Sequence, residues 1–464
     1  MSQYHAINEE ALLAYGAGDT AGAIALWQQS LALEPRQEDV LTYIAATLKG
    51  EGEVGAAAAY YEQALSLNPR QPEAHYNLGN IRQQLGELDS AARCYRNALA
   101  VQPRFALAAY NLGNVCRDLG HLREATECYR HAIKCDPTHA PSHNNLGNAL
   151  KHAGQLEQAI ASYQGALQRQ PDYPDALYNL GNALFESEDF AAAIEWFDRA
   201  GIRDAQARSL YCLYKIERFA EFRERLAEHQ SNAPHHSPQV ATLAAHHAIN
   251  FGTENTYQFC PQPFALVYHE SITELAHPDQ ELRRQLLADI NSSAIDERTQ
   301  GRLHNGVQSA GNLFYRSEAS FRTLADMVRL HLSRYARTFA DQDCELIRHF
   351  PQTLEFESSW YIRMRQGGHL DSHIHESGWI SGVLYLELPS REPGSEEGCF
   401  ELSLTGDNYP ILAAANEWPR RVVQISEGDI VLFPANLFHR TIPFHADAER
   451  ICIAFDLMPA AGPS

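Results

Sequence analysis

A repeat of 34 residues runs through the first half of the sequence and limits what this half can fold into. Each position of the repeat keeps one kind of residue. The proline column is Pro35, Pro69, Pro103, Pro137 and Pro171, the small column is Ala23, Ala57, Ala91, Ala125, Ala159 and Ala193, and the aromatic column is Trp27, Tyr61, Tyr95, Tyr129, Tyr163 and Phe197. Such a period predicts an array of short helical units, because one unit cannot bury its apolar face without its neighbours.

The columns have separate physical roles. Alanine lets neighbouring helices approach, the aromatic rings fill the groove between repeats, and proline ends the second helix of each unit. The pattern resembles the tetratricopeptide repeat over about residues 2–230. Residues 205–230 keep the helical period, but Lys215 stands where glycine is expected, so we predict a degenerate capping end there. We place a tetratricopeptide superhelix at 1–238, a connector at 239–262 and a second domain at 263–464.

The tetrapeptide Asn-Leu-Gly-Asn stands at the same place in four successive repeats. Its two asparagines are three residues apart, so they share one face of a helix. An amide donates and accepts at once, which suits gripping the backbone of an extended peptide on a concave face; tying one repeat to the next is the alternative. The run is similar to the array of the O-linked N-acetylglucosamine transferases, which favours peptide binding. The predicted ladder is Asn77, Asn80, Asn111, Asn114, Asn145, Asn148, Asn179 and Asn182.

The second half changes its period after Pro351. Short runs rich in β-branched and aromatic residues, such as 360–365, 379–388, 429–433 and 450–457, are bounded by Gly, Pro and Asn. Many short strands with such turns predict a jelly roll, preceded by helical residues at about 264–339. The expected fold class is α+β and multidomain: an all-α solenoid followed by a jelly roll, or double-stranded β-helix, with supporting helices.

Three histidines and one arginine on these strands carry the chemical signal. His373 and His375 lie on the same face of an extended segment, His439 follows a strand that ends in Pro434, and Arg450 opens the last strand. Together with Gly367 and Gly428, this set resembles the iron(II) and 2-oxoglutarate-dependent oxygenases, and in particular a bacterial prolyl-hydroxylase-like subgroup often joined to tetratricopeptide arrays. The resemblance covers roughly residues 260–460.

The resemblance implies Fe(II), 2-oxoglutarate and O2 as cofactor and cosubstrates. Two histidines and a third group would hold the metal on one face and leave the other face open. It gives Arg450 the remote carboxylate of 2-oxoglutarate, which arginine suits because it stays charged and binds bidentately; Tyr385 would add a hydroxyl. His373, His439 and Arg450 are thus the predicted catalytic residues, and Arg450 and Tyr385 the predicted cosubstrate-binding residues.

The third metal ligand departs from the common His-x-Asp motif of the superfamily. His375 stands where the carboxylate would be, and His-x-His also occurs in the bacterial subgroup, so we predict His373, His375 and His439 as the metal ligands. Asp371 and Glu376 are the alternatives that would supply a carboxylate. His445 follows closely behind His439 but is expected in a loop.

Two other functions compete with the oxygenase. The same histidines and glycines partly satisfy the motifs of a metal-dependent cupin acting on a small molecule, although the expected glutamate is missing from Trp379 and Ile380 and Arg450 is better explained by 2-oxoglutarate. A scaffold with an idle barrel is the alternative from a different class. We favour an oxygenase that hydroxylates a peptide or protein side chain recruited by the array.

Composition excludes some partners. The chain has 37 Lys and Arg against 58 Asp and Glu, a net charge of -21, so it lacks the basic surface that nucleic acid requires. No apolar run approaches the roughly 18 residues of a bilayer span, so we expect no membrane segment. The nine cysteines are scattered, which fits reduced thiols in the cytoplasm.

Overall fold

The computed structural model describes residues 3–459 except 203, 233–235, 293–294, 296, 299–300, 352–353, 376–377, 407–408 and 415–417. The chain divides into two compact units, Met1–Ala205 and Gln206–Ser464. The first is helical and the second is rich in strands, which confirms the predicted fold class. The domain limits expected at residues 238 and 262 stay a prediction. None of the described helices is both long and apolar enough to cross a bilayer.

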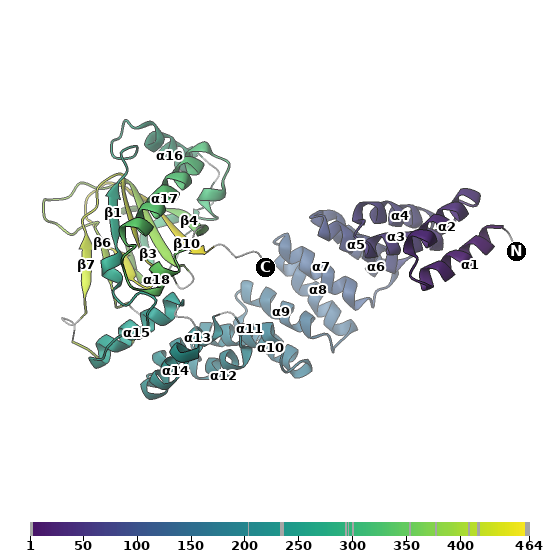
Figure 1. Ribbon diagram of the computed structural model, residues 1–464, viewed down its shortest axis with the longest axis horizontal. Helices are drawn as coiled ribbons and strands as arrows, with labels where there is room; N and C mark the ends of the chain where they lie inside the picture. Colours follow the sequence, from purple (N-terminus) through teal and green to yellow (C-terminus); the bar gives the residue numbers. More distant parts are fainter. Residues whose placement is uncertain are drawn as a thin grey trace. The chain divides into compact units, whose positions relative to one another are not determined.

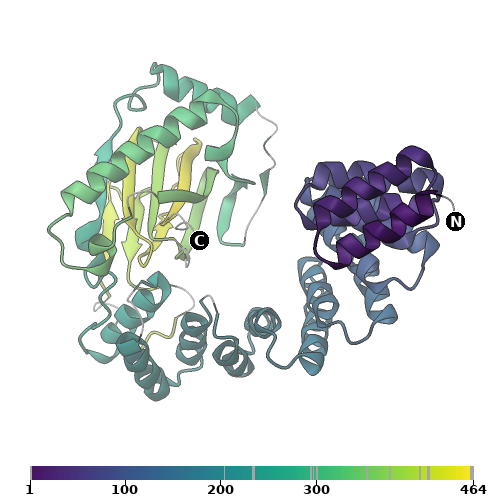
Figure 2. The ribbon, with the colours of Figure 1, turned by 45° about the vertical axis from the view of Figure 1, so that its right-hand side comes forward.

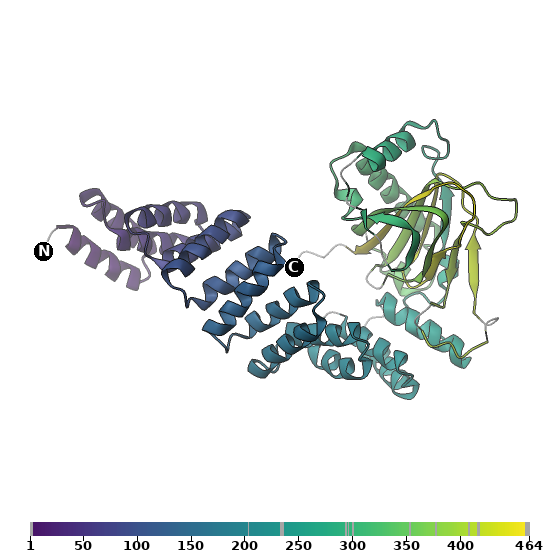
Figure 3. The ribbon, with the colours of Figure 1, turned by 180° about the vertical axis from the view of Figure 1, so that it is seen from behind.

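The first unit is a stack of antiparallel helix pairs (Figures 1 and 3). Each pair occupies one period of the repeat. The helices are α1 (Gln3–Gly16), α2 (Thr20–Leu33), α3 (Glu38–Gly50), α4 (Val54–Leu67), α5 (Pro72–Gln84), α6 (Leu88–Val101), α7 (Ala106–Asp118), α8 (Leu122–Cys135), α9 (Ala140–His152), α10 (Leu156–Arg169), α11 (Pro174–Glu186) and α12 (Phe190–Ala200).

The glycine of each Asn-Leu-Gly-Asn run is required by the ring of the same repeat. A Cβ atom on Gly113 would lie 2.6 Å from Cε1 of Tyr129, and one on Gly147 would lie 2.5 Å from Cε1 of Tyr163. Real Cβ contacts are not this short, so a side chain here would push the two helices of the pair apart. The aromatic column therefore packs directly on the glycine column.

The second unit begins with helices and continues into a curled sheet. Its helical elements are α13 (Ala205–Lys215), α14 (Phe219–Asn232), α15 (Pro238–Phe251), η1 (Pro263–Leu266), α16 (Glu281–Ser292), η2 (Leu313–Tyr315), α17 (Ala319–Thr338) and α18 (Glu345–Arg348). Its strands are β1 (Tyr268–Ser271), β2 (Glu297–Arg298), β3 (Leu303–Ser309), β4 (Leu354–His373), β5 (Ile380–Glu387), β6 (Phe400–Ser403), β7 (Arg420–Val423), β8 (Asp429–Pro434), β9 (Phe438–Thr441) and β10 (Arg450–Pro459).

The strands pair in the order β1-β8-β5-β10-β4-β9-β6-β7, with β3 on the other side of β4 and β2 beyond it. The long strand β4 joins the two walls of the jelly roll, because its length pairs with β10 and its last residues pair with β9. Between the walls lies an apolar core that includes Ile362, Tyr385, Phe400 and Phe433. Figure 2 shows α17 lying across the outer face of the sheet.

Helix α15 is anchored to the barrel by polar contacts at both ends. The Thr242 hydroxyl donates to the main-chain oxygen of Asn436 at 3.1 Å, and the Asn250 amide donates to the main-chain oxygen of Pro410 at 2.7 Å. Asn436 belongs to the turn between β8 and β9, three residues before His439. The helix therefore supports the turn from which one candidate metal ligand projects.

Candidate functional site

The barrel brings His373, His375 and His439 together. His373 ends β4 and pairs directly with His439 of β9, and His375 follows two residues beyond the strand. The ring centroids of His373 and His439 are 4.2 Å apart, and that of His375 lies 5.0 and 4.9 Å from them. One ring nitrogen from each residue fits within a set of atoms no more than 4.8 Å apart. Three imidazoles from two strand ends thus converge on one point.

The Nδ1 atom of each ring already has a partner. His373 Nδ1 contacts the main-chain oxygen of Asp371 at 2.9 Å, His439 Nδ1 contacts that of Leu437 at 3.4 Å, and His375 Nδ1 contacts the Asp456 carboxylate at 2.5 Å. Such contacts fix the tautomer that presents Nε2 to a metal. Burial, followed by the neighbouring His375, lowers the pKa of His373 to about 3. Burial and the neighbouring rings also hold the pKa of His439 well below its usual value, so both rings are neutral, as ligands must be.

Asp456 is a site residue that sequence reasoning missed. It is 5% exposed on β10, between Ser381 of β5 and Ser358 of β4, and both hydroxyls donate to it, at 2.8 and 3.1 Å. Burial would lower the pKa of His375, but the Asp456 carboxylate outweighs burial and raises it. Burial would likewise raise the pKa of Asp456, and His375 with the hydroxyl donors outweighs this and lowers it. The pair is therefore a buried carboxylate and imidazole that stabilise each other's charge.

Arg450 lies at the other end of the same face of β10. It is 1% exposed, and its guanidinium contacts the sulfur of Cys452 at 3.2 Å and the ring of Tyr385, whose centroid is 5.1 Å away. Among the described residues no carboxylate pairs with it, and its Nε has no hydrogen-bond partner. The Tyr385 hydroxyl is also buried and has no partner in the described part of the chain, and burial raises its pKa, so it remains a donor. Buried polar groups of this kind call for an acceptor.

Arg450 and the three histidines line one cavity of about 30 Å³. Its wall also includes the apolar side chains of Trp360, Leu370, Val383, Phe400 and Phe433, together with the polar Ser381, Arg440 and Thr441. The indole Nε1 of Trp360 is buried and has no hydrogen-bond partner among the described residues. The cavity thus combines a cluster of three imidazoles with the Arg450 guanidinium.

The alternative carboxylates lie elsewhere or outside the described residues. The Asp371 side chain contacts His304 and His369, at 2.9 and 3.7 Å, and is not part of the group formed by the three buried histidines. Glu376 lies outside the described residues. His445 is paired with Glu397 at 3.0 Å in an exposed loop, away from the other histidines.

The predicted asparagine ladder forms hydrogen bonds between repeats. Asn111 donates to the side-chain oxygen of Asn80, and Asn145 donates to that of Asn114, both at 2.9 Å. The same oxygens accept from a tyrosine of their own repeat, Tyr95 for Asn80 and Tyr129 for Asn114, both at 2.8 Å. Tyr163 and Asn148 repeat this bond. The amides therefore tie one repeat to the next.

The remaining ladder residues are placed less regularly. Asn77 accepts from Lys49 and Asn179 donates to Asn144, while the side-chain oxygen of Asn182 is buried with no partner in the described part of the chain. Four residues of the ladder, Asn114, Asn145, Asn148 and Asn179, also line a polar pocket of about 440 Å³ together with Tyr110 and Tyr173. The lining consists of Gln83, Tyr110, Asn114, Arg117, Asn144, Asn145, Asn148, Tyr173, Asp175 and Asn179.

Comparison with protein families agrees with both halves. Residues 76–140 and 144–208 match the tetratricopeptide repeat family, 48–86 match a second repeat model, and 358–456 match the family described as "Putative 2OG-Fe(II) oxygenase". The chain carries tetratricopeptide repeats and a domain of the 2OG-Fe(II) oxygenase type. This confirms the predicted fusion. The oxygenase match spans His373, His439 and Arg450, and it ends at Asp456.

Solved structures resemble parts of this chain. MamA is 24% identical over 35% of this chain and 94% of its own, with a TM-score of 0.34. YrrB, a tetratricopeptide protein with an unusual peptide-binding site, is 22% identical over 41% of this chain and 97% of its own, with a TM-score of 0.36. PilF of Pseudomonas aeruginosa is 18% identical over 42% of this chain and 90% of its own, with a TM-score of 0.36. No curated protein matches the sequence.

Proposed function

We propose that this chain is an Fe(II)- and 2-oxoglutarate-dependent dioxygenase that hydroxylates a side chain of a peptide or protein held by the array. The observation that carries the proposal is the pairing, in one cavity, of three converging imidazoles with the buried Arg450, which has no acidic partner among the described residues. A metal ion would bind the three imidazoles, and one carboxylate of a dicarboxylate would pair with Arg450. An idle barrel in a scaffold would have no use for a buried cation of this kind.

The residues fit the cofactor and the cosubstrate. His373, His375 and His439 would hold Fe(II) through Nε2, because each Nδ1 already has an acceptor. Arg450 would bind the remote carboxylate of 2-oxoglutarate, and the unpartnered Tyr385 hydroxyl would donate to the same group. When bound, Fe(II) with 2-oxoglutarate and O2 supplies an oxidation of a C–H bond coupled to decarboxylation to succinate. The apolar wall excludes water and orients the target.

Asp456 accounts for the missing carboxylate of the His-x-His motif. A third neutral ligand leaves more positive charge at the metal than a carboxylate would. Here the negative charge stands one residue further out, 2.5 Å behind His375, where it makes that imidazole a stronger donor to the metal. The two serines hold the carboxylate in place. His375, rather than Asp371, is therefore the third ligand in this proposal.

The decisive experiment is anaerobic addition of Fe(II) and 2-oxoglutarate to the purified chain. We expect a visible charge-transfer band and, once air is admitted, succinate. His439→Ala should lose the band, whereas His445→Ala, a nearby exposed histidine paired with Glu397, should keep it. Folded protein that gives no band and no succinate would leave the scaffold as the better function, and metal binding without any response to 2-oxoglutarate would favour the cupin-type enzyme.

The array would supply the substrate. Its pocket exposes amide donors that the ties between repeats do not use, since Asn114 and Asn148 engage only their side-chain oxygens in the contacts of the described residues. Such amide donors can bind the main-chain carbonyl groups of an extended peptide without contacting its side chains. A tetratricopeptide neighbour, YrrB, has a peptide-binding site, which is in keeping with a peptide partner here.

Recruitment can be separated from the stability of the array by a substitution that spares the ties between repeats. Asn114→Asp keeps the oxygen that accepts from Tyr129 and Asn145, and removes the amide donors. Asn80→Asp makes the same change to the same bonds at a position that does not line the pocket, so it is the matched control. Expected is a higher KM for a protein substrate in Asn114→Asp only, with 2-oxoglutarate turnover in the absence of that substrate unchanged. Equal KM values would refute recruitment at this pocket.

A further inference from the structure

A second group of metal-binding side chains lies on the other face of the strand that carries His373. His304 comes from β3 and His369 and Asp371 from β4, and His304 is the register partner of His369. The Nε2 atom of His304 is 2.9 Å from one oxygen of Asp371, and that of His369 is 3.7 Å from the other. The two rings are stacked, with centroids 4.3 Å apart and an angle of 11° between them.

This group is separate from the candidate iron site. Leu370 points into the core, so His369 and Asp371 on either side of it point outward, and their side chains are 31% and 35% exposed. The irregular pairing between Leu370 and His373 then returns His373 to the interior. None of the three residues lines the cavity that holds Arg450. One strand therefore presents a different set of ligands on each face.

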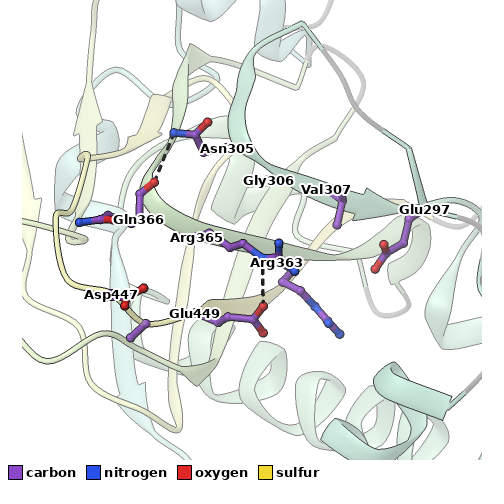
Figure 4. A pocket seen from close by; sticks show the side chains of 10 residues that line it. Glu297, Asn305, Gly306, Val307, Arg363, Arg365, Gln366, Asp447 and Glu449 are labelled. Carbon is purple, nitrogen blue, oxygen red and sulfur yellow. Dashed lines mark hydrogen bonds and ion pairs between the residues drawn. The ribbon is translucent and has the colours of Figure 1, made fainter.

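The backbone holds these side chains in place before any ion arrives. The pairing of β3 with β4 is interrupted between His304 and Gly306, where Asn305 has a positive φ of 48°. The Asn305 amide donates to the main-chain oxygen of Gln366 at 3.3 Å, as Figure 4 shows, and so fastens this bend to β4. On β4, Nδ1 of His369 contacts the main-chain oxygen of Gly367 at 3.1 Å, which leaves Nε2 as the ligand atom.

A third group in the same unit shows what disqualifies a cluster. His236, Glu345 and His349 also lie within ligand distance of one another, but Arg348 occupies one oxygen of Glu345. A cation already bound to the carboxylate opposes a metal ion there. Among the described residues, no arginine or lysine pairs with Asp371.

We propose that His304, His369 and Asp371 bind a divalent transition-metal ion of the Zn²⁺ type. Two imidazoles and a carboxylate suit such an ion, and the ligand atoms, all within 4.8 Å of one another, lie close to the spread expected for ligands about 2.0–2.2 Å from one centre. The exposed side of the group leaves positions for water. The ion clamps β3 to β4 two residues before His373, so it orders the strand end that carries the candidate iron ligand.

The test is the metal content of the full chain after chelation, incubation with Zn²⁺ alone and removal of unbound ion by gel filtration. The intact chain should retain two ions, one in each site. His304→Ala and Asp371→Asn should each retain one, and the same two changes should abolish the rise in Tm that Zn²⁺ gives through this clamp. His349→Ala, an exposed histidine of the disqualified cluster, should still retain two.

The two sites fail separately. A His373→Ala, His439→Ala double variant should keep one ion, and adding His304→Ala to it should remove that ion. If the buried histidines bind no metal, the intact chain retains a single ion that His304→Ala removes, which overturns the proposed function but upholds this site. If His304→Ala and the intact chain retain the same number of ions, the site proposed here is wrong.

Discussion

In the array one hydrogen bond is made three times, whereas in the barrel each polar contact is made once. Tyr95, Tyr129 and Tyr163 donate to Asn80, Asn114 and Asn148, always at 2.8 Å and always across 15 residues. Asp456 instead collects three contacts from residues 75, 81 and 98 positions away in the chain. The first pattern is local and repeated, and the second depends on the register of three strands.

Buried polar groups without hydrogen-bond partners also arise for different reasons in the two units. Two of those in the array occur where a column is broken. Within the described residues, the Tyr61 hydroxyl lacks a partner because Ala46 stands 34 residues before Asn80, and Asn182 lacks one because Phe197 has no hydroxyl. In the barrel, Arg450 lines the cavity with the three histidines, and the ring of Tyr385 lies 5.1 Å from its guanidinium. Tyr61 and Asn182 thus mark irregular repeats, whereas the proposed function gives Arg450 and Tyr385 a ligand to bind.

The largest test of this comparison is Arg450→Met. It should weaken 2-oxoglutarate binding about 30- to 5,000-fold, because a desolvated charged contact to a carboxylate is worth about 2–5 kcal/mol. The same change should raise the free energy of unfolding without ligand by about 1–4 kcal/mol, because an unpaired buried charge is replaced by an apolar side chain. Titration of the charge-transfer band and denaturant unfolding measure the two effects.

The matched control for this prediction is Arg365→Met on the neighbouring strand, whose side chain is 78% exposed. It should change the free energy of unfolding by less than about 0.5 kcal/mol and leave 2-oxoglutarate binding intact. If Arg450→Met destabilised the protein and still bound 2-oxoglutarate normally, Arg450 would be a structural residue, and its lack of a partner would be no guide to function.

The same contrast explains how much the sequence revealed. The columns, the helix pairs and the His-x-His motif depend on short spacings, and the glycine and aromatic columns were visible as a period. Asp456 was missed, although counting in twos from Arg450 along one strand places residue 456 on the same face. The spacing of residues in the sequence could not predict the contacts of Asp456, because these contacts require β10 to lie between β5 and β4 in a particular register. The hydrogen bond between Tyr129 and Asn114 was also missed, although their separation of 15 residues recurs in every complete repeat and was visible in the sequence.

The next prediction concerns the loss of stability at low pH, which should affect the second unit through His246 of helix α15. This ring is fully buried, contacts the Tyr214 hydroxyl at 2.8 Å, and has its pKa lowered to about 3 by burial and then by His247. An unfolded histidine titrates near ~6.5, so the contribution of His246 is complete above that pH and is lost as the pH falls towards the folded value. Between pH 7 and pH 4.5 the second unit should lose about 2–3 kcal/mol through this residue alone.

His246→Phe keeps a ring in the same place and cannot titrate. Measured by denaturant unfolding at a series of pH values, it should show an acid-induced loss smaller by about 2–3 kcal/mol than the intact chain. His152→Gln, at an exposed position of the array, is the control and should leave the pH profile unchanged. An unaltered profile in His246→Phe would mean that the ring is already protonated in the fold.

Asp456→Asn tests whether Asp456 affects iron binding through its contact with His375. The amide keeps the shape, and its one oxygen can still accept from Ser381, while its NH2 group takes the place of the oxygen that accepts from Ser358. The change removes the negative charge behind His375. We expect iron affinity to fall about 10- to 100-fold and the charge-transfer band to shift, with the affinity for 2-oxoglutarate at saturating iron little changed. Ser358→Ala is the matched control, because it removes one donor to the same carboxylate and keeps the charge. A loss of stability with unchanged iron binding would make Asp456 a folding residue only.

The smallest effect should come from restoring the missing hydroxyl of the aromatic column, which should raise the free energy of unfolding of the first unit. Phe197→Tyr would add a hydroxyl where Tyr163 has one in the preceding repeat, and Asn182 already offers a buried oxygen without a partner. Because a buried acceptor gains a donor, the first unit should become more stable by about 0.5–1.5 kcal/mol. Tyr163→Phe removes the corresponding bond to Asn148 and should cost a similar amount, so denaturant unfolding of the two variants should give shifts of opposite sign. No such exchange is expected in the barrel, where adding a partner for Arg450 would compete with its ligand instead of completing a column.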